Sequence, residues 1–146
     1  MTSIKEYLTN DHRLCDDIFA KMEQKAGESL EEAYELTKKF VHDMERHFQR
    51  EERIMFVAFE EKTGMVNGPT EVMRQEHMQM RNIMQQLLKS IQEGDTQKYF
   101  GLTETLMIVL QQHNMKEEQM LYTMAQQHLS AQASDIIAQM NALEVQ

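Results

Sequence analysis

Two pairs of histidine and glutamate in this chain have a spacing that would let each pair bind a metal ion together. Glu51 follows His47 by four residues, and Glu117 follows His113 by four. Residues four apart lie on one face of an α-helix, so the two side chains of each pair can point in the same direction. Imidazole nitrogen and carboxylate oxygen are ligands of iron, manganese and zinc. The spacing therefore predicts two helices that each present one histidine and one glutamate to a shared metal site.

These pairs belong to a repeat of the chain at an offset of 65 to 66 residues. Each half holds a segment in which a histidine precedes two adjacent glutamates, HFQREERIMF at 47–56 and HNMKEEQMLY at 113–122. Each half also holds an earlier segment in which an acidic residue directly precedes a histidine, NDHRLCDDIF at 10–19 and QEHMQMRNIM at 75–84. The repeat adds His12 and His77 to the candidate ligands and indicates two helical hairpins of one plan.

Four long segments have the apolar periodicity of amphipathic helices and can position these side chains. Apolar residues recur at spacings of three and four, and residues that break helices separate the segments. The predicted helices cover about 11–25, 29–62, 69–93 and 95–128, with a shorter one within 130–143. Ser29, followed by Glu32, predicts a capping box at the second start. Short connections favour antiparallel neighbours, so we expect an all-α, up-down-up-down four-helix bundle with a short extra C-terminal helix.

Helix geometry brings the four histidines to one level of this bundle. With a rise of about 1.5 Å per residue, His12 and His47 lie about 21 and 27 Å from the turn that joins their helices. By the same arithmetic, His77 and His113 lie about 25 and 27 Å from theirs. Four imidazoles and two carboxylates in one layer form a set suited to two metal ions. The alternative is an acidic bundle whose core histidines are satisfied by local partners.

Length and residue usage bound the class of protein. The chain has 146 residues with only 5 Gly and 1 Pro, which favours helix and one domain over 1–146, built from hairpin repeats at about 10–62 and 70–128. The single cysteine, Cys15, allows neither an internal disulfide nor a thiolate metal cage. The sequence contains no nucleophile motif that would indicate a hydrolytic enzyme.

Charge and hydropathy exclude several partners. The chain has 15 Lys and Arg against 24 Asp and Glu, a net charge of −9 with histidine neutral, and no basic cluster. Nucleic acids and anionic membrane surfaces are therefore not expected to bind. The longest apolar run, Ile54–Phe59, is too short to cross a bilayer. The first residues also lack the features of a secretory signal, so a cytoplasmic protein is expected.

The whole pattern resembles the hemerythrin-like, or His-His-Glu cation-binding, domain family. The resemblance covers residues 10–124 and rests on four motifs: DHRL at 11–14, HFQRE at 47–51, EHMQM at 76–80 and HNMKE at 113–117. Membership would imply a four-helix bundle around two non-haem iron ions with carboxylate bridges and an oxo or hydroxo bridge. The resemblance makes the terminal ligands His12, His47, His77 and His113, and the bridging ligands Glu51 and Glu117.

Two positions depart from the oxygen-carrying members of that family. Those members have a further histidine one turn before the third-helix ligand, where this chain has Met73. Both irons could therefore keep an exchangeable position. The last carboxylate in those members comes five residues after the histidine, a position held here by Glu118. Glu117 and Glu118 compete for the bridging role, and the His47 to Glu51 spacing favours Glu117.

The resemblance implies a small di-iron protein that binds a diatomic molecule, O2 or NO, or reacts with peroxide. The alternatives are an iron donor that repairs damaged iron-sulfur centres and an iron- or oxygen-sensing module. Long repair members carry an additional N-terminal segment with cysteines, and its absence here makes the repair role less favoured. The sequence predicts no particular protein partner.

Several other residues lie at helical spacing from the proposed ligands. Asp16 is expected to be a solvated or salt-bridged helix residue, and the alternatives are an acceptor for the His12 imidazole or a carboxylate ligand. Asp43 is a candidate acceptor for the His47 imidazole, and the sequence does not decide its role. Cys15 is expected to be a buried core thiol. The chain has 14 methionines, and those near the ligands are expected to fill the core or to line an access pocket: Met44, Met73, Met80, Met84 and Met120. Two histidines are expected to lie outside the site: His42 and His128.

Overall fold

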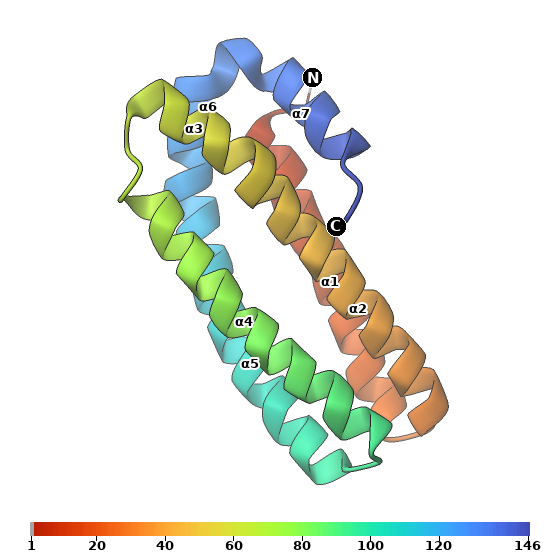
Figure 1. Ribbon diagram of the computed structural model, residues 1–146. Coiled ribbons are helices and arrows are strands. Elements are labelled where there is room, and N and C mark those ends of the chain that lie inside the picture. The colour runs from red at the N-terminus through yellow and green to blue at the C-terminus, as the bar shows by residue number, and fades with distance from the viewer. Residues whose placement is uncertain (1) are drawn as a thin grey trace.

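The computed structural model describes residues 2–146 as a bundle of long helices (Figure 1). The α-helices are α1 (Ile4–Ala26), α2 (Leu30–Arg50), α3 (Phe56–Thr63), α4 (Pro69–Gln92), α5 (Thr96–Lys116), α6 (Tyr122–Leu129) and α7 (Ala133–Ala142). Two π-helical turns, η1 (Glu51–Met55) and η2 (Glu117–Leu121), join α2 to α3 and α5 to α6, and a 3-10 turn, η3 (Ser130–Gln132), joins α6 to α7. The prediction of an all-α four-helix bundle with an extra C-terminal helix is confirmed.

The helices form two antiparallel hairpins that lie side by side. In Figure 1, α1 and α2 (red to orange) form one hairpin, and α4 and α5 (green to cyan) form the other. The continuous runs α2–η1–α3 and α5–η2–α6 correspond to the second and fourth predicted helices. Helix α7 packs against α1, η1 and η3 at the end of the bundle formed by α3 and α6.

Local chemistry explains most helix ends. Asp95 accepts a hydrogen bond from the Lys98 backbone N–H at 3.1 Å and so caps α5. Gly64 ends α3 with a φ of 75°, a left-handed conformation that glycine adopts without a steric penalty. Pro69 opens α4, where its missing N–H has no intrahelical partner to lose.

The predicted capping box at Ser29 is only half formed. Ser29 Oγ accepts from the Glu32 backbone N–H at 3.3 Å. The Ser29 N–H, however, donates to the Lys25 carbonyl at 2.7 Å, and the Glu32 carboxylate pairs with Lys25 Nζ at 3.2 Å. In a full capping box the Ser29 N–H would donate to the Glu32 carboxylate, but the Lys25 carbonyl already accepts from it.

The first helix begins seven residues before its predicted start at Asp11. Ser3 Oγ caps α1 by accepting from the Glu6 backbone N–H at 3.0 Å. The added turns contain Ile4 and Leu8, which are fully buried against residues of α3, α6 and α7. Distant contacts, rather than local periodicity, therefore set this helix start.

The core consists of two apolar clusters with the polar residues of the site between them. The cluster nearer the α1–α2 and α4–α5 turns contains Phe19, Phe40, Phe48, Leu87, Tyr99 and Leu106. The cluster at the α7 end contains Ile4, Phe59, Leu121, Leu129, Ile136 and Met140. Burial of these side chains contributes about 1.5 to 3 kcal/mol each, so apolar packing on both sides supports the polar layer.

Four of the five methionines near the proposed ligands fill the core. Met44, Met80 and Met84 belong to the first cluster, and Met73 belongs to the second. Met120 is 59% exposed, so its predicted place in the core or an access pocket is wrong. It lies on the outward side of η2, opposite Glu117 and Leu121. Within residues 2–146, no helix has the length and apolar character needed to cross a membrane.

Candidate metal centre

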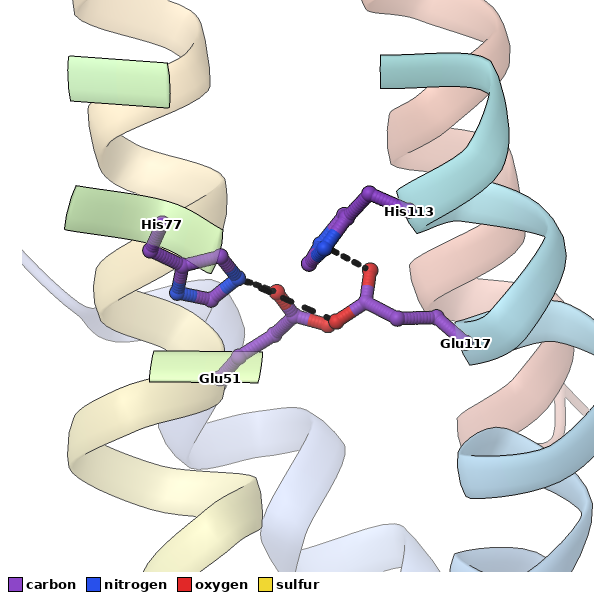
Figure 2. A group of neighbouring side chains, drawn as sticks. All are labelled: Glu51, His77, His113 and Glu117. Carbon is purple, nitrogen blue, oxygen red and sulfur yellow. Dashed lines mark ion pairs between the residues drawn. The ribbon is translucent and has the colours of Figure 1, made fainter. Parts of the chain in front are cut away.

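Four buried side chains from four elements meet between the two hairpins. Glu51, His77, His113 and Glu117 each offer one ligand atom, and these atoms all lie within 4.8 Å of one another. His77 Nε2 lies 3.1 Å from Glu51 Oε1, and His113 Nε2 lies 3.1 Å from Glu117 Oε1. Figure 2 shows the two imidazoles and the two carboxylates pointing toward one another. We refer to these four residues as the first group.

The ligand atoms of the first group lack hydrogen-bond partners. Glu51 Oε1, His77 Nε2, His113 Nε2 and Glu117 Oε2 are all buried without one. Buried polar atoms in proteins are nearly always paired, because leaving them unpaired costs about 1 to 3 kcal/mol each. The atoms approach one another closely but are not aligned to bond with each other. A cation among them would satisfy all four, so the residues present fit a metal ion.

Two further histidines gather beside the first group and share Glu117 with it. His12, His47 and Glu117 form this second group, whose atoms also lie within 4.8 Å of one another. His12 Nε2 lies 3.1 Å and His47 Nε2 4.0 Å from Glu117 Oε1. Glu51 Oε1 is 3.4 Å from His47 Nε2. Both glutamates therefore lie within reach of both groups, and the structure brings together all six residues predicted from the sequence.

Each glutamate begins a π-helical turn. The Phe56 N–H bonds to the Glu51 carbonyl, and the Tyr122 N–H bonds to the Glu117 carbonyl, both five residues back. A π-helical turn places residue i+5 over residue i, whereas an α-helix turns it to another face. Phe56 stacks on the His77 ring at a centroid distance of 5.8 Å, and Tyr122 stacks on the His12 ring at 5.5 Å.

Tyr122 is a site residue that the sequence analysis missed. Its hydroxyl donates to Glu51 Oε2 at 2.6 Å and lies 3.0 Å from Glu117 Oε1. It also lies 3.0 Å from His12 Nε2 and 3.3 Å from His47 Nε2. The signal in the sequence was the aromatic residue at the end of each repeated segment. A regular α-helix, however, would turn this residue away from the ligands.

Every histidine of the two groups is held at its outer nitrogen by a carboxylate from a neighbouring helix. The four Nδ1 to carboxylate distances are 2.8 Å for His12–Glu118, 3.0 Å for His47–Asp11, 2.7 Å for His77–Glu52 and 2.8 Å for His113–Glu76. The contacts run from α1 to α2, from η1 to α4, from α4 to α5 and from η2 back to α1. We call Asp11, Glu52, Glu76 and Glu118 the carboxylate ring.

A cationic side chain pairs with each member of the carboxylate ring. The distances are 2.7 Å for Glu118–Arg13, 2.9 Å for Asp11–Arg50, 2.8 Å for Glu52–Arg81 and 2.6 Å for Glu76–Lys116. A carboxylate only accepts hydrogen bonds, so each Nδ1 carries a proton and Nε2 is directed inward. This arrangement is the one that orients imidazoles toward a metal.

The electrostatics of the metal-free site favour binding of positive charge. Burial lowers the pKa of His47, but Glu51 and the hydrogen bond to Asp11 outweigh it and raise that pKa to about 10. Neighbouring carboxylates likewise outweigh burial and raise the pKa of His77 and of His113. Protons on these imidazoles offset the charge of the inner glutamates, and a cation can replace them.

The two inner glutamates are unequal. Burial and the charge of Glu117 raise the pKa of Glu51. Burial also acts to raise the pKa of Glu117, but the charge of His113 and hydrogen bonds from its neighbours bring it well below the ordinary value. Glu117 thus carries negative charge at the point where the two groups meet.

The two aspartates considered as acceptors for His12 and His47 take other partners. Asp16 is half exposed and pairs with Arg13 at 3.4 Å, while Glu118 occupies the outer nitrogen of His12. Asp43 pairs with Lys39 at 3.1 Å on its own helix, and Asp11 reaches His47 instead. The salt-bridged role expected of Asp16 is confirmed. The role of Asp43, which the sequence left open, is not that of partner to His47, because an adjacent helix supplies the carboxylate of Asp11.

The other residues singled out from the sequence lie as expected. Cys15 is buried in the first apolar cluster with a free thiol. His42 and His128 are exposed, outside both groups. A cleft of about 540 Å³ between α1 and α5 ends at Glu118, one hydrogen bond from His12. Its lining includes Arg13, Phe19, Met107, Leu110, Met115 and Glu118.

Comparison with known families agrees with this geometry. The family model described as "Hemerythrin HHE cation binding domain" matches residues 3–125. No curated protein and no solved structure matches the chain. The matched range contains all six residues of the two groups and all four members of the carboxylate ring.

Proposed function

The chain belongs to the hemerythrin HHE cation-binding domain family, and we propose that it holds two iron ions and uses them to bind or react with a small molecule such as O2, NO or peroxide. In this proposal, His77 and His113 bind one iron, and His12 and His47 bind the other. Glu51 and Glu117 lie between the two positions and bridge them. A donor set of imidazole and carboxylate without sulfur suits iron.

The observation that carries the proposal is the set of four unpaired ligand atoms in the first group. A buried layer of this kind is costly in a protein that binds nothing there. The carboxylate ring adds support, because it fixes the direction of each imidazole before any cation arrives. The four ring carboxylates are matched by four cationic side chains, so the charge of the two inner glutamates remains for the metal.

The protein's own residues would control what reaches the irons. All six proposed ligands are almost fully buried, so bulky or strongly hydrated molecules are excluded. The cleft between α1 and α5 offers an approach as far as Glu118, whose carboxylate bonds to the outer nitrogen of His12. Bound iron would supply exchangeable coordination positions and electrons, and the surrounding chain would limit access to small, weakly hydrated molecules.

Iron binding tests the proposal directly. Chelator-stripped protein is titrated with Fe²⁺ without oxygen, and bound iron is counted after desalting. We expect two irons per chain, and an absorption spectrum that changes when O2 or NO is added. Substitution of a first-group ligand in His77→Ala, or of a second-group ligand in His12→Ala, lowers the iron content. The exposed histidine substitution His128→Ala is the matched control and leaves it unchanged.

Two outcomes would contradict the proposal. Wild-type protein that retains no iron after desalting would remove the metal centre altogether. Iron that is bound but passes to an apo iron-sulfur acceptor, with no spectral response to O2, NO or peroxide, would support the iron-donor alternative instead.

A further inference from the structure

Tyr122 lies inside the proposed metal centre but is not one of its six proposed ligands. Its side chain is fully buried, and its hydroxyl contacts both inner glutamates. The same hydroxyl oxygen lies 3.0 Å from His12 Nε2 and 3.3 Å from His47 Nε2. The phenol oxygen therefore touches every residue of the second group.

The two groups differ in how many ligand atoms lie within 4.8 Å of one another. The first group has four ligand atoms, from Glu51, His77, His113 and Glu117, and the second has three. Neighbouring donors around a cation with bonds of about 2.1 Å are separated by about 3 Å in octahedral geometry. The phenol oxygen has this separation from His12 Nε2 and from Glu117 Oε1, at 3.0 Å each. It therefore lies where a further donor of this metal position would stand, beside His12, His47 and the two bridging glutamates.

The internal repeat supplies an independent comparison. Phe56 holds the position of Tyr122 in the other half, since each follows a π-helical turn that begins at an inner glutamate. Both rings stack on a histidine, Phe56 on His77 and Tyr122 on His12. A phenyl ring is therefore sufficient for the packing role. The hydroxyl is an addition to one half only, and it lies beside the two histidines of the second group.

We propose that Tyr122 is a further protein donor of the metal position formed by His12, His47 and Glu117, in addition to the bridging Glu51. This inference rests on the proposed function, because it requires a metal in the second group. On binding, the O–H bond of the phenol breaks, an oxygen–metal bond forms, and the proton leaves to solvent. The two metal positions are then chemically different, with a phenolate at one position and none at the other.

Spectroscopy of ferric protein tests the proposal, because a tyrosine phenolate bound to Fe³⁺ absorbs visible light and gives tyrosinate bands in resonance Raman spectra. Stripped protein is loaded with two equivalents of Fe²⁺ and oxidised in air. We expect both signals in the wild type and their loss in Tyr122→Phe. We also expect the dissociation constant of the more weakly bound iron to rise about 10- to 100-fold in Tyr122→Phe. A loss of this size is typical when a group that supports a metal site is removed.

Two further variants isolate the hydroxyl. Tyr99→Phe is the matched control, because Tyr99 is equally buried but its hydroxyl bonds to Thr37, in the other apolar cluster. It should keep both signals. Phe56→Tyr places a phenol in the matching position beside His77, and we expect it to strengthen the tyrosinate signal.

The outcomes separate this inference from the proposed function. Two bound ferric irons without a tyrosinate signal in the wild type, or with a signal that persists in Tyr122→Phe, would overturn the role of Tyr122 alone. Absence of bound iron would overturn the metal centre itself. Should Tyr122→Phe fail to fold, the triple variant Tyr7→Phe, Tyr34→Phe and Tyr99→Phe decides the question. It retains Tyr122 as its single tyrosine, so its signal must equal that of the wild type.

Discussion

Glu117 and Glu118 are adjacent in sequence but contact opposite nitrogens of the His12 imidazole, Glu117 at Nε2 and Glu118 at Nδ1. Glu117 is fully buried and belongs to both groups of ligand atoms. Glu118 accepts from the outer nitrogen of His12 and pairs with Arg13. Glu51 and Glu52 divide in the same way, with Glu52 on the outer nitrogen of His77. The geometry therefore favours Glu117 over Glu118 as a bridging ligand, as the repeat spacing does.

Substitution of the two neighbouring glutamates distinguishes these roles. Glu117→Gln removes the shared anionic donor, so we expect iron content to fall from two per chain to one or fewer. Glu118→Gln leaves all proposed ligands in place, so we expect two irons with affinity about 10- to 100-fold weaker. Iron is counted after desalting, and affinity is measured by competition with a chelator. Glu104→Gln changes an exposed glutamate and serves as the control. The reverse ranking of the first two variants would exchange the roles of the two residues.

Cys15 should be unreactive while the protein is folded. Burial raises the pKa of its thiol to about 12, so at pH 8 only about one thiol in ten thousand is the nucleophilic thiolate. We expect reaction with a thiol reagent to be at least ~100-fold slower in native protein than in denaturant. The colour change of a disulfide reagent measures both rates. Rapid stoichiometric reaction of native protein would contradict the buried position of the thiol.

At the scale of elements, the helices were predictable because their signals are local. Apolar spacing, Gly64, Pro69 and Asp95 act within a few residues and mark the ends of the helices in the middle of the chain. The four histidines were also predictable as one layer, since helix rise is constant. The start of α1 was not, because Ile4 and Leu8 are fixed by contacts with the far end of the chain.

The π-helical turns explain what the sequence analysis missed in the site. In a regular α-helix, Tyr122, five residues after Glu117, would turn away from the centre. The π-helical turn brings Tyr122 back over Glu117. The carboxylate ring was missed for a different reason, since each of its contacts joins two helices and depends on their relative rotation. The sequence shows that each ring carboxylate is adjacent to a proposed ligand, but it does not show which histidine on another helix each carboxylate contacts.

The junction of α3 and α4 depends on Glu60, whose carboxylate accepts from Thr70 Oγ1 at 2.6 Å and from Arg74 Nη2 at 3.1 Å. Hydrogen bonding to Arg74 is the main cause of a lowered pKa at Glu60. A lowered folded-state pKa stabilises the protein above the ordinary value of 4.5 and loses that effect as the pH falls through the folded-state pKa.

Glu60→Gln should therefore destabilise the protein at pH 7 by about 1 kcal/mol. The difference from wild type should shrink steadily below pH 4.5, where the wild-type carboxylate takes up a proton. Urea unfolding of both proteins from pH 7 to pH 3 measures the free energies. The neighbouring variant Glu61→Gln changes an exposed carboxylate and should differ little from wild type. A pH-independent difference at Glu60 would show that the ion pair is not its source.

At the scale of the whole molecule, the polar layer adds contacts between the two hairpins to those made by the two apolar clusters. Glu52 joins η1 to α4, and Glu118 joins η2 to α1, so two contacts of the carboxylate ring cross between the hairpins. Arg50 pairs with Asp11 and also donates to the Met140 carbonyl at 3.0 Å, which ties α7 to the same ring. The order of this polar layer is thereby connected to α7, at one end of the bundle.

Iron should consequently stabilise the whole bundle, because only the folded chain brings the ligands together. Ligand at 100 times its dissociation constant contributes about 2.7 kcal/mol when the unfolded chain does not bind. We expect Fe²⁺, added without oxygen, to raise the urea midpoint of stripped protein by a corresponding amount. Amide hydrogen exchange should slow most in η1 and η2, and in both hairpins rather than in one.

Acidification should reverse this stabilisation, because protons compete with iron for the imidazoles. The neighbouring carboxylates raise the pKa of His47 to about 10 in the metal-free protein, so iron must displace a proton there even at neutral pH. The iron-dependent shift of the urea midpoint should therefore grow from pH 6 to pH 8. Glu117→Gln is the control and should show a smaller shift than wild type at every pH. A wild-type midpoint that does not respond to iron, or an equal response in Glu117→Gln, would mean that the buried layer is not where the metal binds.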